Sequence, residues 1–156
     1  NTQRAGVRFN TTSLHGAKIY NNTFYNTNTG GNTAYGALTN DWRLPVAAVD
    51  IQNNIFWPAP GSRYLGGTVG FDEKSTMLVR NLWHGGRGAY ALDLSPVAAD
   101  PRFVAPGKDF RLAKGSPAIG AGATSALTAA LITTDFDLTT SRSASKGIDI
   151  GAFGAQ

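Results

Sequence analysis

The chain has 156 residues, of which 42% are hydrophobic and 15% are charged, a composition that excludes an intrinsically disordered protein and suffices for one domain with a core. It contains no cysteine, which excludes disulfides and thiolate metal sites, and no apolar run of the roughly 20 residues that a membrane span needs. The formal net charge of +4 favours acidic partners, but Lys and Arg are scattered, which argues against a nucleic-acid-binding surface.

Short strands are expected to recur along the first hundred residues. They are predicted at residues 7–9 and 69–71 and within three similar segments at 18–24, 50–56 and 78–83. Each of these three segments reads as a strand, a corner that contains Asn and a large apolar residue, and the third segment is one residue shorter than the others. A recurrence at intervals of about 30 residues is typical of a solenoid. The sequence therefore predicts stacked β coils with loops of variable length.

Equivalent positions in the three segments predict columns of stacked side chains. We expect an aliphatic column of Ile19, Ile51 and Val79, an aromatic column of Phe24, Phe56 and Trp83, and a polar column of Asn21, Asn53 and Asn81. Asn tolerates the left-handed backbone angles of a sharp corner, and stacked amides can bond to each other along the solenoid axis. These Asn residues are therefore assigned a structural role.

Three motifs follow from Asp100 onward: Asp-Pro-Arg-Phe at 100–103, Gly-Ser-Pro-Ala-Ile-Gly-Ala-Gly at 115–122 and Gly-Ile-Asp-Ile-Gly-Ala-Phe at 147–153. This succession closely resembles the closing segment of bacterial extracellular β-helix proteins of the pectate-lyase-like superfold. The resemblance implies an all-β protein, a right-handed parallel β-helix with irregular loops. Residues 1–99 would form the coils, and residues 100–156 an extended closing segment of the same domain. It also implies a secreted or cell-surface location.

The closing segment departs from the family pattern at two glycines. Gly120 stands where the family usually has Asp, and Gly154 stands where an acid often follows the aromatic residue, so we expect looser packing in these turns. Asp135, Arg142 and Asp149 match the family's order of acid, base and acid. A pairing among these three residues that holds the C-terminal loop is favoured over catalysis.

The resemblance implies a parent protein that acts on polysaccharides, as a lyase or a glycoside hydrolase. Lyases of this kind typically use carboxylates, often with calcium, and a base that removes a proton next to a uronate carboxyl. Asp72, Arg80 and His84 are the candidate catalytic residues, although each also fits an ordinary turn or surface position. Calcium is the one cofactor left open. The residues aligned with Asp50 are Lys18 and Leu78, so no carboxylate column forms there, and we expect the chain alone to lack lyase activity.

Aromatic and basic residues between the repeats suggest a binding surface for acidic polysaccharide. Its expected members are Trp42, Arg43, Trp57, Arg63 and Tyr64. Exposed aromatic rings can stack on sugar rings while guanidinium groups hold carboxylates, although the same aromatic residues can also cap the side of a solenoid. Two other functions stay open, a non-catalytic carbohydrate-binding or adhesive surface module and a structural fibre or spike.

The strand expected at residues 7–9 lies almost at the chain start. Solenoid ends normally need a covering element, and an exposed strand edge invites pairing with another strand. We therefore expect this end to pair either with another chain or with further N-terminal coils.

Overall fold

The structure is a computed structural model of the chain. It describes residues 3–10, 16–40, 48–67, 71, 74–88, 90–138, 141–142 and 147–155. Within these ranges the regular structure is mostly β-strand, with one short α-helix and one 3-10 turn. No helix in the described part of the chain is long and apolar enough to cross a membrane.

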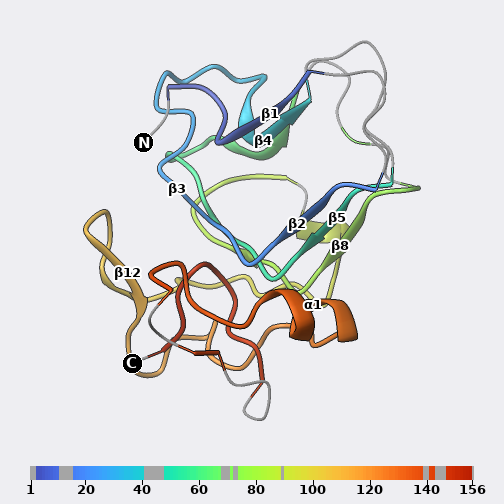
Figure 1. Ribbon diagram of the computed structural model, residues 1–156. Coiled ribbons are helices and arrows are strands. Elements are labelled where there is room, and N and C mark those ends of the chain that lie inside the picture. The colour runs from blue at the N-terminus through green and yellow to red at the C-terminus, as the bar shows by residue number, and fades with distance from the viewer. Residues whose placement is uncertain are drawn as a thin grey trace.

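Three parallel sheets, here named A, B and C, enclose the main hydrophobic core. Sheet A holds β1 (Val7–Phe9), β4 (Gly36–Asn40) and β7 (Arg63–Gly66); sheet B holds β2 (Lys18–Tyr20), β5 (Asp50–Gln52), β8 (Met77–Val79) and β10 (Asp93–Leu94); and sheet C holds β3 (Thr23–Tyr25), β6 (Ile55–Trp57) and β9 (Leu82–Trp83). The chain passes through sheets A, B and C in this order three times, and each strand pairs with its counterpart in a neighbouring turn. Figure 1 shows sheet A at the top and sheet B at the right, with β3 descending on the left. The fold is therefore of the all-β type with parallel sheets.

Inward-facing side chains form columns because the three turns are paired in register. Ile19 lies opposite Ile51, and Ile51 lies opposite Leu78. The third member of the aliphatic column is thus Leu78, and the prediction of Val79 was wrong by one residue. The aromatic column has the predicted members: ring centroids of Phe24 and Phe56 lie 5.0 Å apart, and those of Phe56 and Trp83 lie 4.5 Å apart, with nearly parallel planes.

The corner between sheets B and C explains this shift of one residue. The third segment begins at Met77, which lies opposite Asp50, so it is as long as the other two and Leu78 is not the counterpart of Asp50. Asn21, Asn53 and Arg80 occupy the left-handed position, with φ of 53°, 56° and 51°. Asn81 is therefore equivalent to the second Asn of each earlier corner, and Asn21, Asn53 and Asn81 do not form one column.

Sheet A contains strands that the sequence analysis did not predict. β4 is buried along its whole length, and β7 pairs with it directly. Of the strand predicted at residues 69–71, only Phe71 lies among the described residues, where its ring packs edge-on against Phe9 at 5.7 Å.

The segment after residue 100 packs against the outer side of sheet C. It contains an antiparallel hairpin of β11 (Phe103–Ala105) and β12 (Asp109–Leu112), followed by α1 (Ala126–Leu131). A second core cluster joins Ile55 and Leu82 of sheet C to apolar residues of this segment, namely Phe103, Leu112, Ala118 and Ile150. Sheet C therefore buries apolar side chains on both faces, whereas this segment lies away from sheet A (Figure 1).

Candidate functional site

Two arginines lie next to each other on adjacent turns, at the first residue of β7 in sheet A and at the equivalent position of the turn that follows. Arg63 and Arg87 form a parallel β-bridge, in which Tyr64 N donates to Arg87 O and Arg87 N donates to Ser62 O. Both side chains are exposed. Arg63 Nε donates to Thr33 O at 3.0 Å, and Arg87 Nε donates to Gly61 O at 2.8 Å. These bonds anchor each guanidinium group through Nε, and within the described part of the chain no acceptor is bonded to its terminal nitrogens.

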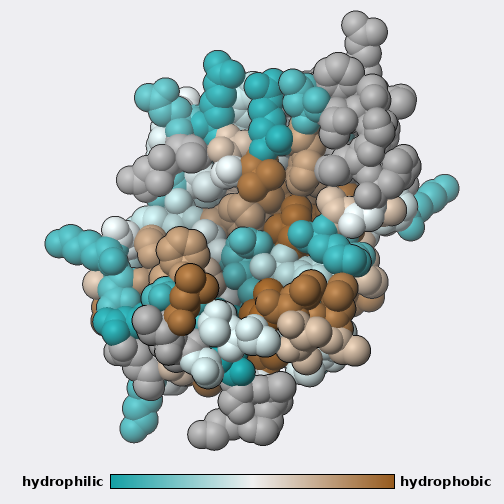
Figure 2. Space-filling model, in the orientation of Figure 1, coloured by the Kyte–Doolittle hydropathy of each residue, from teal (hydrophilic) through white to brown (hydrophobic). Residues whose placement is uncertain are grey.

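The described segments around these arginines carry no acidic residue. Residues 3–10, 26–40, 58–67 and 85–88 include no Asp or Glu, and among the described residues neither Arg63 nor Arg87 is paired with a carboxylate. Arg4 lies over the ring of Tyr35, with its guanidinium carbon 5.8 Å from the ring centroid. Figure 2 shows hydrophilic side chains gathered over the outer side of β1 and β4. The outer side of sheet A is thus basic and polar.

The predicted aromatic residues are placed differently from one another. Tyr64 is only 4% exposed and packs edge-on against Trp83 at 5.0 Å, so it belongs to the core, and its prediction as a sugar-stacking residue was wrong. Its hydroxyl accepts a bond from Gly86 N at 3.1 Å. Trp57 is half-buried at the end of β6, with its ring edge-on to His84 at 4.5 Å. Trp57 thus lies directly before the corner that leads to Arg63. Trp42 and Arg43 lie outside the described residues.

The candidate catalytic residues are not brought together. Arg80 lies at the left-handed corner position before β9 and His84 follows this two-residue strand, so the two residues stand at opposite ends of it. Arg80 is exposed and its Nη1 donates to Ala121 O at 3.3 Å. Asp72 lies outside the described residues.

Arg142 and Asp135 form a buried ion pair that ties the C-terminal segment together. Arg142 Nε donates to Asp135 Oδ1 at 2.6 Å, and the two side chains are 6% and 4% exposed. Arg142 also donates to the backbone oxygens of Asp149 and Gly151. The side chain of Asp149 itself accepts bonds from Gly120 N at 2.7 Å and from Ala155 N.

The two glycines that depart from the family pattern are therefore held by acids from elsewhere. Asp149 accepts from Gly120 N, and Asp135 Oδ2 accepts from Gly154 N at 2.9 Å. The expectation of looser packing at Gly120 and Gly154 did not take these two hydrogen bonds into account. Residues far apart in the sequence supply the carboxylates.

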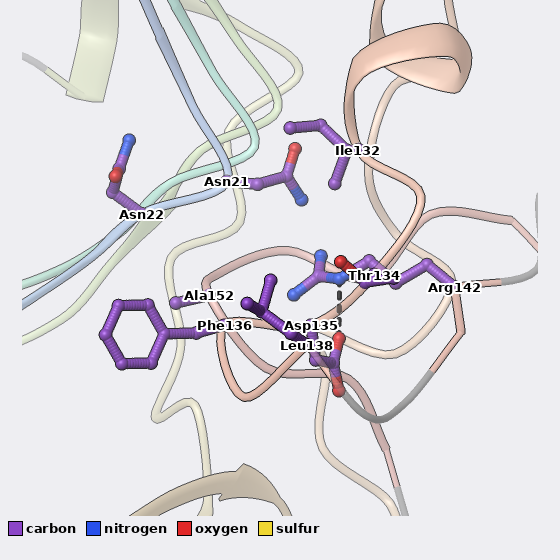
Figure 3. A pocket seen from close by; sticks show the side chains of 9 residues that line it. All are labelled: Asn21, Asn22, Ile132, Thr134, Asp135, Phe136, Leu138, Arg142 and Ala152. Carbon is purple, nitrogen blue, oxygen red and sulfur yellow. Dashed lines mark hydrogen bonds and ion pairs between the residues drawn. The ribbon is translucent and has the colours of Figure 1, made fainter.

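A cavity of about 190 Å³ lies beside this ion pair. It is lined by Asn21, Asn22, Ile132, Thr134, Asp135, Phe136, Leu138, Arg142 and Ala152 (Figure 3). Figure 3 shows the guanidinium of Arg142 turned toward Asp135, with Asn21 on the other side of it. Because three nitrogens of Arg142 already donate to acceptors within the protein, its charge serves the fold.

Asp93 is a buried acid that the sequence analysis did not single out. It lies opposite Leu78 and thus stands in the aliphatic column, where it is 6% exposed. Its Oδ2 accepts three bonds, from Asn81 N, Asn81 Nδ2 and Trp83 Nε1, at 2.8–3.0 Å. Burial raises the pKa of Asp93 above its usual value, although these hydrogen bonds act in the opposite direction. An acid in register with Ile19 and Ile51 was the signal that could have revealed it.

The raised pKa of Asp93 should make the free energy of unfolding depend on pH. A raised pKa means that the folded state binds the proton more tightly than the unfolded state does. Protonation of Asp93 therefore stabilises the fold fully below the unfolded pKa of about 3.9, and this contribution is lost as the pH rises through the folded pKa. Asp93→Asn cannot titrate, so the free energy of unfolding of the native protein minus that of this variant should fall as the pH rises above about 4.

Urea unfolding at a series of pH values measures this difference. Asp100→Asn is the matched control, because it removes the same charge from an exposed position. A difference for Asp93→Asn that stays constant or rises with pH would contradict the prediction.

The described residues contain no group of three His, Asp or Glu side chains close enough to hold a metal ion. No family model matches the chain, and no curated protein matches it. The function therefore has to be inferred from the side chains of this chain.

Proposed function

We propose that the three sheets form a right-handed parallel β-helix. The repeated passage through sheets A, B and C supports this, because Val7 pairs with Leu38, Ile19 with Ile51 and Ile51 with Leu78, at intervals of 31, 32 and 27 residues. Connections between parallel strands of one sheet are almost always right-handed, which supports the hand. The motifs at residues 100–103, 115–122 and 147–153 support the same fold, because they resemble the closing segment of β-helix proteins of the pectate-lyase-like superfold.

We infer that this chain contributes scaffold and an acidic-polysaccharide-binding surface to a secreted protein that acts on polysaccharides. The pair of exposed arginines, Arg63 and Arg87, is the observation that carries the binding role. Strands of adjacent turns lie about 4.8 Å apart, so a polymer running across them meets one guanidinium on each turn. The separation of Arg80 from His84 along β9 favours a binding role over a catalytic one for this part of the protein.

The chemistry of the pair selects carboxylate or sulfate groups. A guanidinium group presents its N–H donors in a planar fork that matches a carboxylate with two parallel bonds. Because Nε of each arginine is already bonded to a loop carbonyl, the side chains lose less freedom when a ligand binds. Half-buried Trp57 and His84 lie at the end of sheet C, one corner before these arginines, and offer ring surface to a sugar.

Replacing both Arg63 and Arg87 by Ala should weaken binding to polygalacturonate about 10-fold, since each exposed charge pair contributes up to about 1 kcal/mol. Binding to the native chain should also weaken as salt rises, because exposed charges are screened. Isothermal titration calorimetry measures both effects.

Three comparisons make this experiment decisive. Lys108→Ala with Lys114→Ala removes the same charge from exposed positions of the C-terminal segment and should leave the affinity unchanged. Arg63→Lys with Arg87→Lys keeps the charge but loses the planar fork, and should fall between the native chain and the Ala variant. Equal affinity of the native chain and the double Ala variant would remove this surface as the binding site.

A further inference from the structure

A ladder of hydrogen-bonded side chains runs along the corner between sheets B and C, and it has a direction. Asn22 donates from its backbone N and from Nδ2 to Asn54 Oδ1, at 2.9 and 3.1 Å. Asn54 donates in the same way to Asn81 Oδ1, with both distances 2.9 Å. Each Asn therefore donates to the turn that follows it, and the Oδ1 atoms of Asn54 and Asn81 accept from the turn before.

The ladder is closed at its C-terminal end. Asn81 donates its backbone N and Nδ2 to Asp93 Oδ2, and an ionised carboxylate can only accept hydrogen bonds. Leu82 pairs with Val97, which places Pro96 at the position equivalent to Asn81. Proline has no backbone N–H. The position equivalent to Asn81 therefore has neither a backbone N–H nor a side-chain amide to continue the ladder.

The ladder is open at Asn22. Among the described residues nothing donates to Asn22 Oδ1, and Asn22 is exposed, whereas Asn54 and Asn81 are fully buried. By the rule that the other members follow, this oxygen lacks the two N–H donors of a preceding turn. Asn54 Oδ1 and Asn81 Oδ1, in contrast, each accept two hydrogen bonds from the preceding turn.

The three sheets are open at the same end. β1, β2 and β3 are the edge strands of sheets A, B and C, so each presents backbone groups on the side away from its partner. Apolar side chains reach this end: Val7 is 39% exposed, and Phe9 and Ile19 are half-buried against the core. Figure 2 shows apolar side chains gathered between β1 and β2, with a further apolar group over α1. An open polar ladder and an open core thus share one face.

We propose that this face binds one further turn of parallel β-strands that carries Asn at the corner above Asn22. Its backbone N–H and side-chain amide donate to Asn22 Oδ1, and its apolar residues cover Ile19 and the aromatic column. A second copy of this chain stacked head to tail does not fit, because the ladder position of its free end is Pro96, which has no N–H to donate to Asn22 Oδ1. This inference does not depend on polysaccharide binding.

The test adds such a turn to the chain. A second copy of residues 4–34 is inserted before residue 4, an extension of 31 residues that matches the register of Val7 with Leu38. We expect one cooperative unfolding transition at a higher urea midpoint. We also expect amide exchange at least about 10-fold slower for the amides of β1, β2 and β3 that point away from their partners.

Two variants of the added turn test the ladder itself. Asn→Asp at the copy of Asn22 removes the side-chain donor and sets a carboxylate against Asn22 Oδ1, so the gain in midpoint and in protection should be lost. Asn→Asp at the copy of Asn32 is the matched control. Asn32 is exposed and its side-chain Oδ1 accepts from Ala34 N, a bond that a carboxylate can also accept, so the gain should remain. Equal behaviour of the two variants would overturn the proposal. So would an added turn whose amides exchange as in a free peptide, or a stable dimer of the unextended chain that protects the same amides.

Discussion

Replacing Arg142 by Met is expected to lower the free energy of unfolding by about 3–5 kcal/mol, because it leaves the buried carboxylate of Asp135 without its partner. The substitution also removes the donors to the backbone oxygens of Asp149 and Gly151, which hold the last turns in place. Urea unfolding followed by circular dichroism measures the change.

Two further variants separate the buried charge from the lost contacts. Asp135→Asn combined with Arg142→Met removes the unpaired charge while an oxygen remains to accept from Gly154 N, so part of the stability should return. Arg111→Met breaks a partly exposed Arg–Asp pair and should have a much smaller effect. If Arg142→Met and Arg111→Met were equally mild, the ion pair would not hold the C-terminal segment.

Replacing Phe56 by Ala is expected to cost about 3–5 kcal/mol, because it opens a cavity in the middle of the aromatic column. Phe56 is fully buried and stacks on both Phe24 and Trp83. Neither neighbour can close the gap without leaving its own strand register. Thermal and urea unfolding both report this loss.

Phe136→Ala is the control for this substitution. Phe136 is 75% exposed, and surface substitutions change stability by no more than about 0.5 kcal/mol. Comparable losses for the two variants would mean that the aromatic column does not support the fold.

Some features of the fold follow from local pattern. The alternation around Ile19 and Ile51 and the large ring five residues after each predicted which side chains stack, because period-2 alternation sends every second side chain into the core. Register within the third turn did not follow. Two Asn residues stand at each of the first two corners and only Asn81 at the third, so the sequence allowed Asn81 to match either one. Hydrogen bonding decides the match: the second position needs an amide for the ladder, whereas the left-handed first position accepts Arg80.

The candidate site was predictable only in part. Arg63 was recognised as a basic residue between repeats, but its pairing with Arg87 depends on which strands become neighbours across 24 residues of chain. Tyr64 shows the same limit, because an aromatic residue beside Arg63 fits both an exposed loop and a buried strand. Only the packing of its ring on Trp83 places it in the core.

By itself the sequence determined the all-β character, the recurring strand-and-corner segments and the composition of the aromatic column. These depend on short-range alternation and on turn residues that act within a few positions of each other. The tertiary structure decided the strands of sheet A, the member of each column in the third turn, the burial of Asp93 in register with Ile51 and Leu78, and the side on which Arg63 and Arg87 lie together. Each of these features rests on contacts between residues from different turns. The energies of these contacts depend on which strands are paired, and no single segment specifies that pairing.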